Sequence, residues 1–260
     1  MRPAPTHRRS SRLRAAYFVS AGLLLLTGGA VIMMLAAIAT LGRKRRLYAA
    51  MAARVAESVL TVCGVRYVVH RDRPWPEGQV VYVSNHPCSL DPFLLVALRM
   101  PNTRFFLSGW LKKVLPFGII ARLLGTFFTV PQDRPEERVQ IFQRADRILR
   151  ATGESVYLSP EGRRVDTGKI GAFNKGAFHL ATSLRAPVVP IYFSVPPEVN
   201  PGRGFDVGRG TVHLYVQPPI DTSAWRIEDV VANKERVREL FVQWHREHTD
   251  WAAAPSPALA

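Results

Sequence analysis

An uncharged stretch near the N-terminus constrains the fold of this chain more than any other feature. From Ala15 to Leu41, about 27 residues, there is no Asp, Glu, Lys or Arg, which is long enough for a helix to cross a bilayer. A cleaved signal peptide normally has an apolar region of about half this length. Basic residues flank the stretch on both sides: Arg2, Arg8, Arg9, Arg12 and Arg14 before it, and Arg43, Lys44, Arg45 and Arg46 after it. We therefore expect residues 1–60 to hold the protein at a membrane.

Two arrangements of this stretch fit the sequence equally well. In the first, a single helix spans the bilayer. In the second, Gly28 and Gly29 at the middle of the run separate two short helices that dip into one leaflet, so that both basic flanks stay on the anionic cytoplasmic face. The positive-inside rule does not decide between them, because both flanks are basic. In either case we expect the remainder of the chain on the cytoplasmic face.

The charge of the chain points to the same partner. The sequence has 35 Lys and Arg against 20 Asp and Glu, a net charge of +15. Residues 1–54 contain 10 of the basic residues and none of the acidic ones, so only +5 belongs to the rest. An anionic membrane surface is the natural partner of such a segment. Two cysteines, Cys63 and Cys88, are too few for a disulfide framework, which fits a reducing compartment.

Apolar runs alternate with amphipathic segments over most of the chain, which predicts an α/β domain. We expect a single domain over residues 61–250, with a central mixed sheet flanked by helices, preceded by the N-terminal membrane-associated helical segment and followed by a disordered tail at 251–260. Residues 105–130 mix large apolar residues with Lys112 and Lys113 and fit either a core helix and strand or a surface that also touches lipid. Strands are expected at 64–70, 80–83, 155–158, 187–195 and 211–216, and helices at 47–63, 92–98, 134–150, 173–184 and 225–251.

The first candidate site follows the predicted strand at 80–83, where a polar turn carries His86 and, five residues later, Asp91. Histidine takes and gives protons near neutral pH, and a nearby carboxylate fixes its tautomer and stabilises the imidazolium. Pro87 indicates that His86 precedes the next helix, so that His86 and Asp91 can converge. The alternative is an ordinary turn histidine, with Asp91 in the first turn of a helix. Cys88 fits either a thiolate nucleophile or a small buried thiol.

The second candidate site follows the predicted strand at 155–158. Glu161, Gly162, Arg163 and Arg164 lie at the strand end, where α/β folds tend to bind ligands. Arginine matches phosphate oxygens with its planar fork, glycine lets the backbone approach an anion closely, and Lys175 adds another cation. The alternative is a basic surface turn with Glu161 in a local ion pair.

Taken in order, the segments Asn85–Asp91, Pro160–Arg164 and Val189–Ile191 resemble the motifs of the glycerolipid acyltransferases of the lysophosphatidate acyltransferase type. That family has an NHxxxxD motif, a second motif with glycine, phenylalanine and arginine, a PEGTR-like third motif and a VPI-like fourth motif. The resemblance covers about residues 60–220. It implies an acyltransferase that needs no metal or other cofactor, with acyl-CoA or acyl carrier protein as co-substrate.

The resemblance also implies roles for individual residues. His86 would be the general base that removes the proton from the acceptor hydroxyl, and Asp91 would orient its imidazole. Glu161 and Gly162 would shape the part that holds the phosphate of the acceptor, and Arg164 matches the arginine of the family motif. The strand at Val189–Ile191 would help to form the core beside the acyl site, or be a plain buried strand.

The sequence departs from the family motifs at several positions. Ser159 stands where an aromatic residue is common, and Arg163 replaces threonine. In the second motif Gly125 and Phe128 fit, but Pro131 falls about where the arginine is expected and Arg134 comes a few residues late. Arg134 is therefore carried forward as a candidate phosphate ligand that is displaced from the motif.

We expect transfer of a fatty acyl group from acyl-CoA or acyl carrier protein to the free hydroxyl of lysophosphatidate, giving phosphatidate in phospholipid synthesis. The acceptor could also be another lysolipid, such as a lyso-ornithine lipid, a lysophospholipid or a glycolipid. The alternative of another class is a membrane-tethered protein that binds anionic lipid or nucleic acid, although the sequence has no recognised nucleic-acid motif. His245 and His248 could share a helix face as metal ligands, but their charged surroundings favour a solvated surface and no metal is expected. Acyl-chain length and oligomeric state stay open.

Overall fold

The computed structural model describes residues 7–165, 168–199 and 207–249, and the predicted tail at 251–260 lies outside them, as does Arg2. The helices are α1 (His7–Ala39), α2 (Arg45–Val62), α3 (Asp91–Ala97), the 3-10 helix η1 (Gly109–Lys113), α4 (Leu115–Leu123), α5 (Pro135–Thr152), α6 (Gly176–Leu184) and α7 (Val230–Thr249). The strands are β1 (Val65–His70), β2 (Val81–Ser84), β3 (Thr103–Ser108), β4 (Phe127–Thr129), β5 (Ser155–Leu158), β6 (Val188–Ser194) and β7 (Gly210–Val216).

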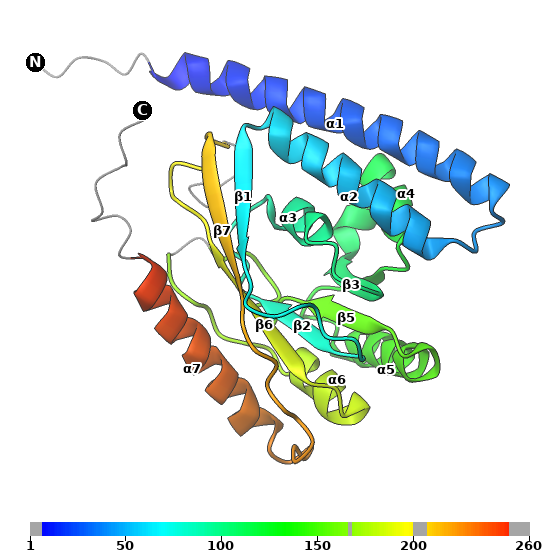
Figure 1. Cartoon of the computed structure of the whole chain (residues 1–260), viewed down its shortest axis with the longest axis vertical. Helices are drawn as coiled ribbons and strands as arrows, with labels where there is room; N and C mark the ends of the chain where they lie inside the picture. Colours follow the sequence, from blue (N-terminus) through cyan, green and yellow to red (C-terminus); the bar gives the residue numbers. More distant parts are fainter. Residues whose placement is uncertain (1–6, 166–167, 200–206, 250–260) are drawn as a thin grey trace, which may run out of the picture.

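The described strands form one sheet with the order β1-β7-β6-β2-β5-β3-β4. The pairs from β6 through β2, β5 and β3 to β4 are parallel, and β1 also runs parallel to β7. The β6–β7 pair is antiparallel, so β7 and β1 run against the other strands. The expected mixed sheet flanked by helices is confirmed (Figure 1). Because β2, β3, β4 and β5 are parallel, their carboxyl ends meet at one edge of the sheet.

Helices cover both faces of the sheet because its central strands are apolar on both sides. Every residue of β2, β5 and β6 is buried. Successive side chains of a strand point to opposite faces, so Tyr82 packs in the cluster that contains Leu60 of α2 and Leu94 of α3. Val81 and Val83 pack in the other cluster, which contains buried side chains of α5, α6 and α7. The two layers fix β2 rigidly at the centre of the domain.

The N-terminal segment forms a pair of antiparallel helices, α1 and α2, that lie side by side at one end of the molecule (Figure 1). Helix α1 continues without a break through Gly28 and Gly29, so the chain does not turn there as the two-helix arrangement requires; it turns at residues 40–44. A Cβ at Gly29 would lie 2.5 Å from a methyl group of Val55, so the glycine lets the two helices approach closely.

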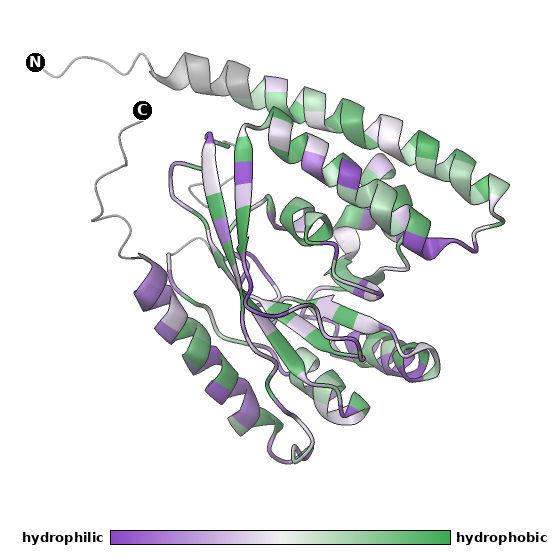
Figure 2. Ribbon diagram, viewed as in Figure 1, coloured by the Kyte–Doolittle hydropathy of each residue, from purple (hydrophilic) through white to green (hydrophobic). Residues whose placement is uncertain are grey.

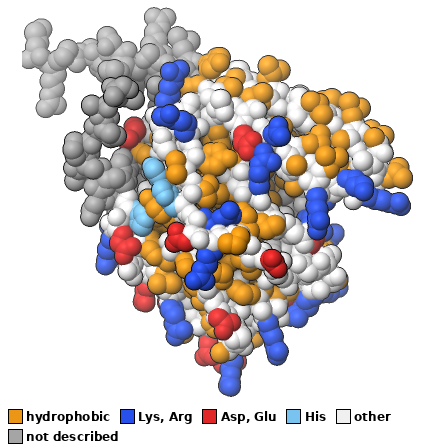
Figure 3. All heavy atoms as spheres, viewed as in Figure 1, with side chains coloured by type: hydrophobic (Ala, Val, Ile, Leu, Met, Phe, Trp, Pro, Cys, Tyr) orange, Lys and Arg blue, Asp and Glu red, His pale blue; other side chains and the backbone are white. Residues whose placement is uncertain are grey.

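The outer face of α1 is apolar and exposed. Within the described residues, Ala15–Ala39 is long and apolar enough to cross a membrane, and most of it is not buried in the protein. Figure 2 shows the described part of α1 as almost entirely hydrophobic, and Figure 3 shows hydrophobic side chains gathered over it. Exposed apolar area of this extent marks a surface that contacts lipid or another protein. It fits the membrane association expected from the sequence.

Most predicted elements agree with the structure to within a few residues, and two segments differ. Residues 105–130, expected to hold one helix and one strand, contain the end of β3, then η1, α4 and β4. The last helix begins at Val230 rather than at Trp225, whose side chain instead packs against the core near Phe178.

Candidate active site

The turn after β2 lies at the carboxyl edge of the sheet, and Asn85 fixes it to the neighbouring strand. The Asn85 side chain donates to the carbonyl of Phe193 at 3.0 Å, and the Phe193 N–H donates to Asn85 Oδ1 at 2.8 Å. Asn85 thus continues the β2–β6 ladder by one step with its side chain. Ser84 adds a hydrogen bond between its hydroxyl and the Tyr157 hydroxyl of β5 at 2.8 Å. The backbone that carries His86 is therefore held from both sides.

His86 and Asp91 converge as the sequence suggests. Helix α3 begins at Asp91, so His86 lies in the turn before it, and His86 Nδ1 donates a hydrogen bond to Asp91 Oδ2. Asp91 is only 1% exposed, and its other oxygen accepts a hydrogen bond from Cys88 Sγ at 2.8 Å. The bond on Nδ1 leaves Nε2 as the imidazole nitrogen that can accept a proton.

The environment of His86 raises the pKa of its imidazole. Burial acts to lower this pKa, as does the charge of Arg164. The hydrogen bond to Asp91 and the negative charges of Asp91 and Glu161 outweigh both, and the net shift is upward from 6.5. A base with a raised pKa holds the proton that it removes more strongly.

Glu161 connects the second candidate segment to the first. Its carboxylate accepts the backbone N–H of His86 at 2.6 Å and that of Gly171 at 2.7 Å. Burial raises the pKa of Glu161, although both backbone hydrogen bonds and the charge of His86 act in the opposite direction. No ion pair of Glu161 with an arginine occurs among the described residues, contrary to the surface-turn alternative. Glu161 therefore holds the loops together behind the imidazole.

Gly162 adopts a left-handed backbone conformation, with φ +67°. A Cβ there would lie 2.7 Å from Nδ2 of Asn174, which donates to the carbonyls of Pro160 and Glu161 at 2.9 and 3.1 Å. The turn therefore depends on a residue without a side chain. Arg164, which is exposed, donates to the Ser89 hydroxyl at 2.9 Å and so joins the two motifs across the mouth of the site.

A cavity of about 450 Å³ opens in front of His86 and Asp91. Gly162 and Arg163 line it, together with Arg138, which the sequence analysis did not single out. Arg138 is half-buried on α5 and donates to the carbonyl of Val130 at 3.1 Å. Further polar groups of the lining come from Gln132, Ser159 and Asn174. The cavity thus combines the imidazole with two guanidinium groups.

Three of the candidate cations do not line this cavity: Arg164, described above, Arg134 and Lys175. Arg134 is exposed and pairs with Glu137, one turn along α5, at 3.5 Å. Lys175 is exposed at the start of α6, and only its neighbours Asn174 and Gly176 contribute to the lining. Arg138 lies one helical turn after Arg134, and this i, i+4 spacing is the signal by which it could have been found.

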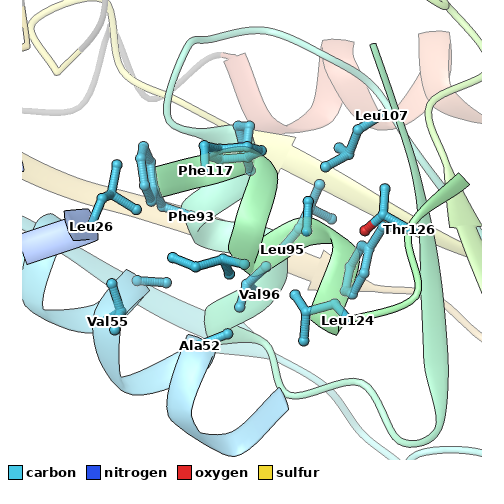
Figure 4. Close-up of a pocket in the computed structure, with 15 residues that line it drawn as sticks. Leu26, Ala52, Val55, Phe93, Leu95, Val96, Leu107, Phe117, Leu124 and Thr126 are labelled. Carbon is cyan, nitrogen blue, oxygen red and sulfur yellow. The ribbon is translucent and has the colours of Figure 1, made fainter. Parts of the chain in front are cut away.

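A second, apolar cavity lies beside the first. Figure 4 shows its side chains, which come from α1 and α2 (among them Leu26 and Val55) and from α3, β3 and α4. It has a volume of about 40 Å³ and shares Pro92, Leu95 and Leu107 with the first cavity, the candidate catalytic cavity. These three side chains therefore form a common wall with a polar cavity on one side and an apolar one on the other.

Comparison with known proteins agrees with this geometry. The sequence model of the Acyltransferase family matches residues 66–194, which contain strands β2 to β6 and both candidate motifs. The 1-acyl-sn-glycerol-3-phosphate acyltransferase alpha of Ovis aries is 29% identical over 185 residues, covering 71% of this chain and 64% of that protein. The chloroplastic 1-acyl-sn-glycerol-3-phosphate acyltransferase LPAT1 of Arabidopsis thaliana is 29% identical over 246 residues, covering 90% and 65%. The chain therefore contains an acyltransferase domain, which includes both candidate motifs.

The fold agrees with that of a solved acyltransferase. The crystal structure of the 1-acyl-sn-glycerophosphate (LPA) acyltransferase PlsC from Thermotoga maritima superposes with a TM-score of 0.79 at 18% identity, covering 96% of this chain and 99% of that chain. Against its curated relatives, this acyltransferase spans just under two thirds of their length, 64% and 65% for the two named above.

The other residues that the sequence analysis of this acyltransferase considered are packed within the fold. Cys88 is fully buried, and burial together with the charge of Asp91 raises the pKa of its thiol well above 9.0, which disfavours a thiolate nucleophile. Val189–Ile191 lies within β6 and is buried beside β2. His245 and His248 are half-buried on α7 against Tyr192, rather than on a solvated face, and the described residues contain no cluster of three or more metal-ligating side chains.

Proposed function

We propose that this acyltransferase moves a fatty acyl group from a thioester donor to the free hydroxyl of lysophosphatidate, giving phosphatidate. The observation that carries the proposal is the position of the His86–Asp91 pair in a cavity that shares one wall with a small apolar cavity. The cavity with Arg138 and Arg163 suits an anionic head, and the apolar side chains around the neighbouring cavity of about 40 Å³ offer a surface against which a fatty chain can pack. The names of the curated relatives support this acceptor.

In the proposed reaction, His86 Nε2 removes the proton of the acceptor hydroxyl as its oxygen attacks the thioester carbonyl. The buried carboxylate of Asp91 keeps the proton on Nδ1 and stabilises the imidazolium that forms. When the tetrahedral intermediate collapses, the C–S bond breaks and the imidazolium returns its proton to the departing thiolate. The products are the ester and a free thiol, so no acyl-enzyme and no cofactor are needed.

The acceptor phosphate is assigned to the cationic side of the catalytic cavity. Arg138 is half-buried there, which strengthens its interaction with an anion relative to the exposed Arg134. Arg163, which lines this cavity, is exposed, and so are Arg164 and Lys175, which follow in the same part of the chain. A lysolipid without a phosphate would make little use of these cations, and for this reason lysophosphatidate is favoured over glycolipid and lyso-ornithine acceptors.

The α1–α2 pair is assigned to the membrane. Helix α2, which packs along α1, exposes charged and polar groups such as Arg54 and Ser58. A transverse α1 would bring these groups into the hydrocarbon, where they are costly. We therefore place α1 in one leaflet, with the catalytic domain on the cytoplasmic face, where acyl-CoA and acyl carrier protein are available as donors.

The test is acyl transfer from oleoyl-CoA, and from the matching acyl carrier protein, to a panel of lysolipids in detergent micelles. Wild type and His86→Ala are compared, with circular dichroism to verify that the variant folds. Acylation of lysophosphatidate that falls by about 10²-fold or more in the variant supports the proposal. If only another lysolipid is acylated, lysophosphatidate is not the acceptor. A variant as active as wild type would refute the role of His86.

A further inference from the structure

The segment that follows β3 presents large apolar side chains to the outside next to the catalytic cavity. Trp110 of η1 is 62% exposed and Leu115, at the start of α4, is 72% exposed. Their neighbours Ser108 and Leu111 line the catalytic cavity, so the same short segment forms both a wall of the cavity and an exposed apolar surface. We call Gly109–Leu115 the rim segment.

The exposed leucine continues an apolar stripe that begins at α1. Leu115, Ile119 and Leu123 recur every four residues and therefore share one face of α4. Ile119 and Leu123 pack against the cluster that contains Met33 of α1, and α4 lies in contact with α1. Leu115 continues this stripe at the first position of α4, where it is exposed. The apolar face of α4 thus links the exposed leucine to the apolar side chains of α1.

Two cations separate the exposed aromatic and the exposed leucine. Lys112 and Lys113 are both exposed, and the rim segment contains no acidic residue. Tryptophan is enriched where hydrocarbon meets lipid head groups, and a lysine beside it can extend its ammonium to the phosphates. The pattern of charge and apolar area matches an anionic lipid surface and does not match a site for a neutral soluble partner.

We propose that the rim segment is a second membrane contact, in which Trp110 and Leu115 insert among the lipids beside α1 and the two lysines contact the phosphates. The contact holds the mouth of the catalytic cavity against the bilayer, so that the lysolipid acceptor passes to His86 without crossing water. The passage of the lysolipid from the bilayer to His86 rests on the proposed function, whereas the insertion of Trp110 and Leu115 does not.

The insertion is tested with the full-length chain reconstituted in vesicles of phosphatidylcholine and phosphatidylglycerol. An environment-sensitive NBD label is attached at Leu115→Cys; the native Cys63 and Cys88 are buried and do not compete for it. The matched control is Val231→Cys, which is 48% exposed at the start of α7, and α7 packs on the opposite face of the sheet from α1. Spin-labelled lipid should quench the label at 115 several-fold more strongly than the label at 231. Equal quenching at the two positions would overturn the proposal.

The effect on catalysis is tested with the double variant Trp110→Ser, Leu115→Ser. Each apolar side chain that no longer inserts weakens the binding of the rim segment to the bilayer by about tenfold. The apparent KM for lysophosphatidate presented in vesicles should therefore rise about tenfold or more. The rate with a short-chain lysophosphatidate that is dissolved as a monomer should change less than about twofold. An equal loss with both substrates would mean a damaged cavity wall and would refute the entry route. If wild type acylates no lysolipid at all, the proposed function fails, and the quenching result still decides the membrane contact.

Discussion

The substitution Asp91→Asn separates the charge of the carboxylate from its geometry. In the wild type, the Nδ1–H of His86 and, at 3.4 Å, the N–H of Cys88 both point to Asp91 Oδ2, while the Cys88 thiol points to Oδ1. An asparagine places its carbonyl oxygen where two N–H donors meet and turns its amide toward the thiol, because sulfur is a weak acceptor that tolerates it. The imidazole then keeps its orientation and its tautomer.

The loss expected from this substitution follows from the charge alone. A hydrogen bond to a charged group contributes about 1.5–3 kcal/mol against about 0.5–1.5 kcal/mol for a neutral one. The difference, about 1–1.5 kcal/mol, corresponds to about a tenfold fall in kcat/KM, and weaker stabilisation of the imidazolium extends it toward 100-fold. Asp91→Ala, which removes the orienting partner as well, should lose about 10³-fold, nearer to His86→Ala.

The pH profile gives an independent measurement. His86 acts as a base only when it is neutral, so kcat/KM falls as the pH drops below its pKa, which the structure raises above 6.5. Asparagine removes the carboxylate that raises this pKa, while burial and Arg164 continue to lower it, so the acid limb should move to lower pH. A profile that stays in place, or an Asp91→Asn variant as impaired as Asp91→Ala, would refute this account of the pair.

Three other substitutions test the site. Arg138→Gln should raise the KM for lysophosphatidate about 10- to 100-fold with a smaller effect on kcat, because a charged hydrogen bond is lost. Arg134→Gln is the control and should change the KM less than about threefold. Equal effects of the two variants in a steady-state assay would contradict the assignment of Arg138. Gly162→Ala should lower the free energy of unfolding by about 1–2 kcal/mol or more, because φ is +67° and the Cβ meets the Asn174 side chain. Gly153→Ala, with φ +65° and nothing within 4 Å, is the control that carries only the backbone cost, and identical melting temperatures for the two variants would argue against the contact. Cys88→Ala should retain activity within about threefold, and complete inactivation of a folded variant would restore the thiol as a nucleophile.

Much of the fold can be predicted from the sequence because the central strands are short, continuous apolar runs. The strand at Ser155–Leu158 is found with its observed bounds, and the one ending at Ser194 with an error of one residue at each end. Residues 105–130 are predicted less well, because apolar residues dominate their strands and their helix alike. Hydrophobic periodicity cannot separate buried strands from buried helices in such a segment.

The candidate site can be predicted only where the contact is local in sequence. His86 and Asp91 are five residues apart, and Pro87 indicates that they can converge. The hydrogen bond from the His86 backbone to Glu161 joins residues 75 positions apart, and no pattern in either segment reveals it. Arg138 is not predicted for a different reason: its helix carries many charged residues, and the i, i+4 spacing from Arg134 does not by itself show which of the two arginines faces the cavity. The chemical roles of these residues stay predictions until the variants are measured.

The way in which α1 is attached has a consequence for how such an enzyme can be handled and how it can evolve. Leu26 of α1 forms part of the roof of the apolar cavity, and Met33 packs with Tyr48 of α2 and Ile120 of α4. The anchor is therefore a structural part of the catalytic unit and not an exchangeable tether. Removing it to obtain a soluble enzyme, or grafting an unrelated membrane helix in its place, would take away one wall of the apolar cavity. A substitution on this face of α1 therefore changes the cavity as well as the anchor.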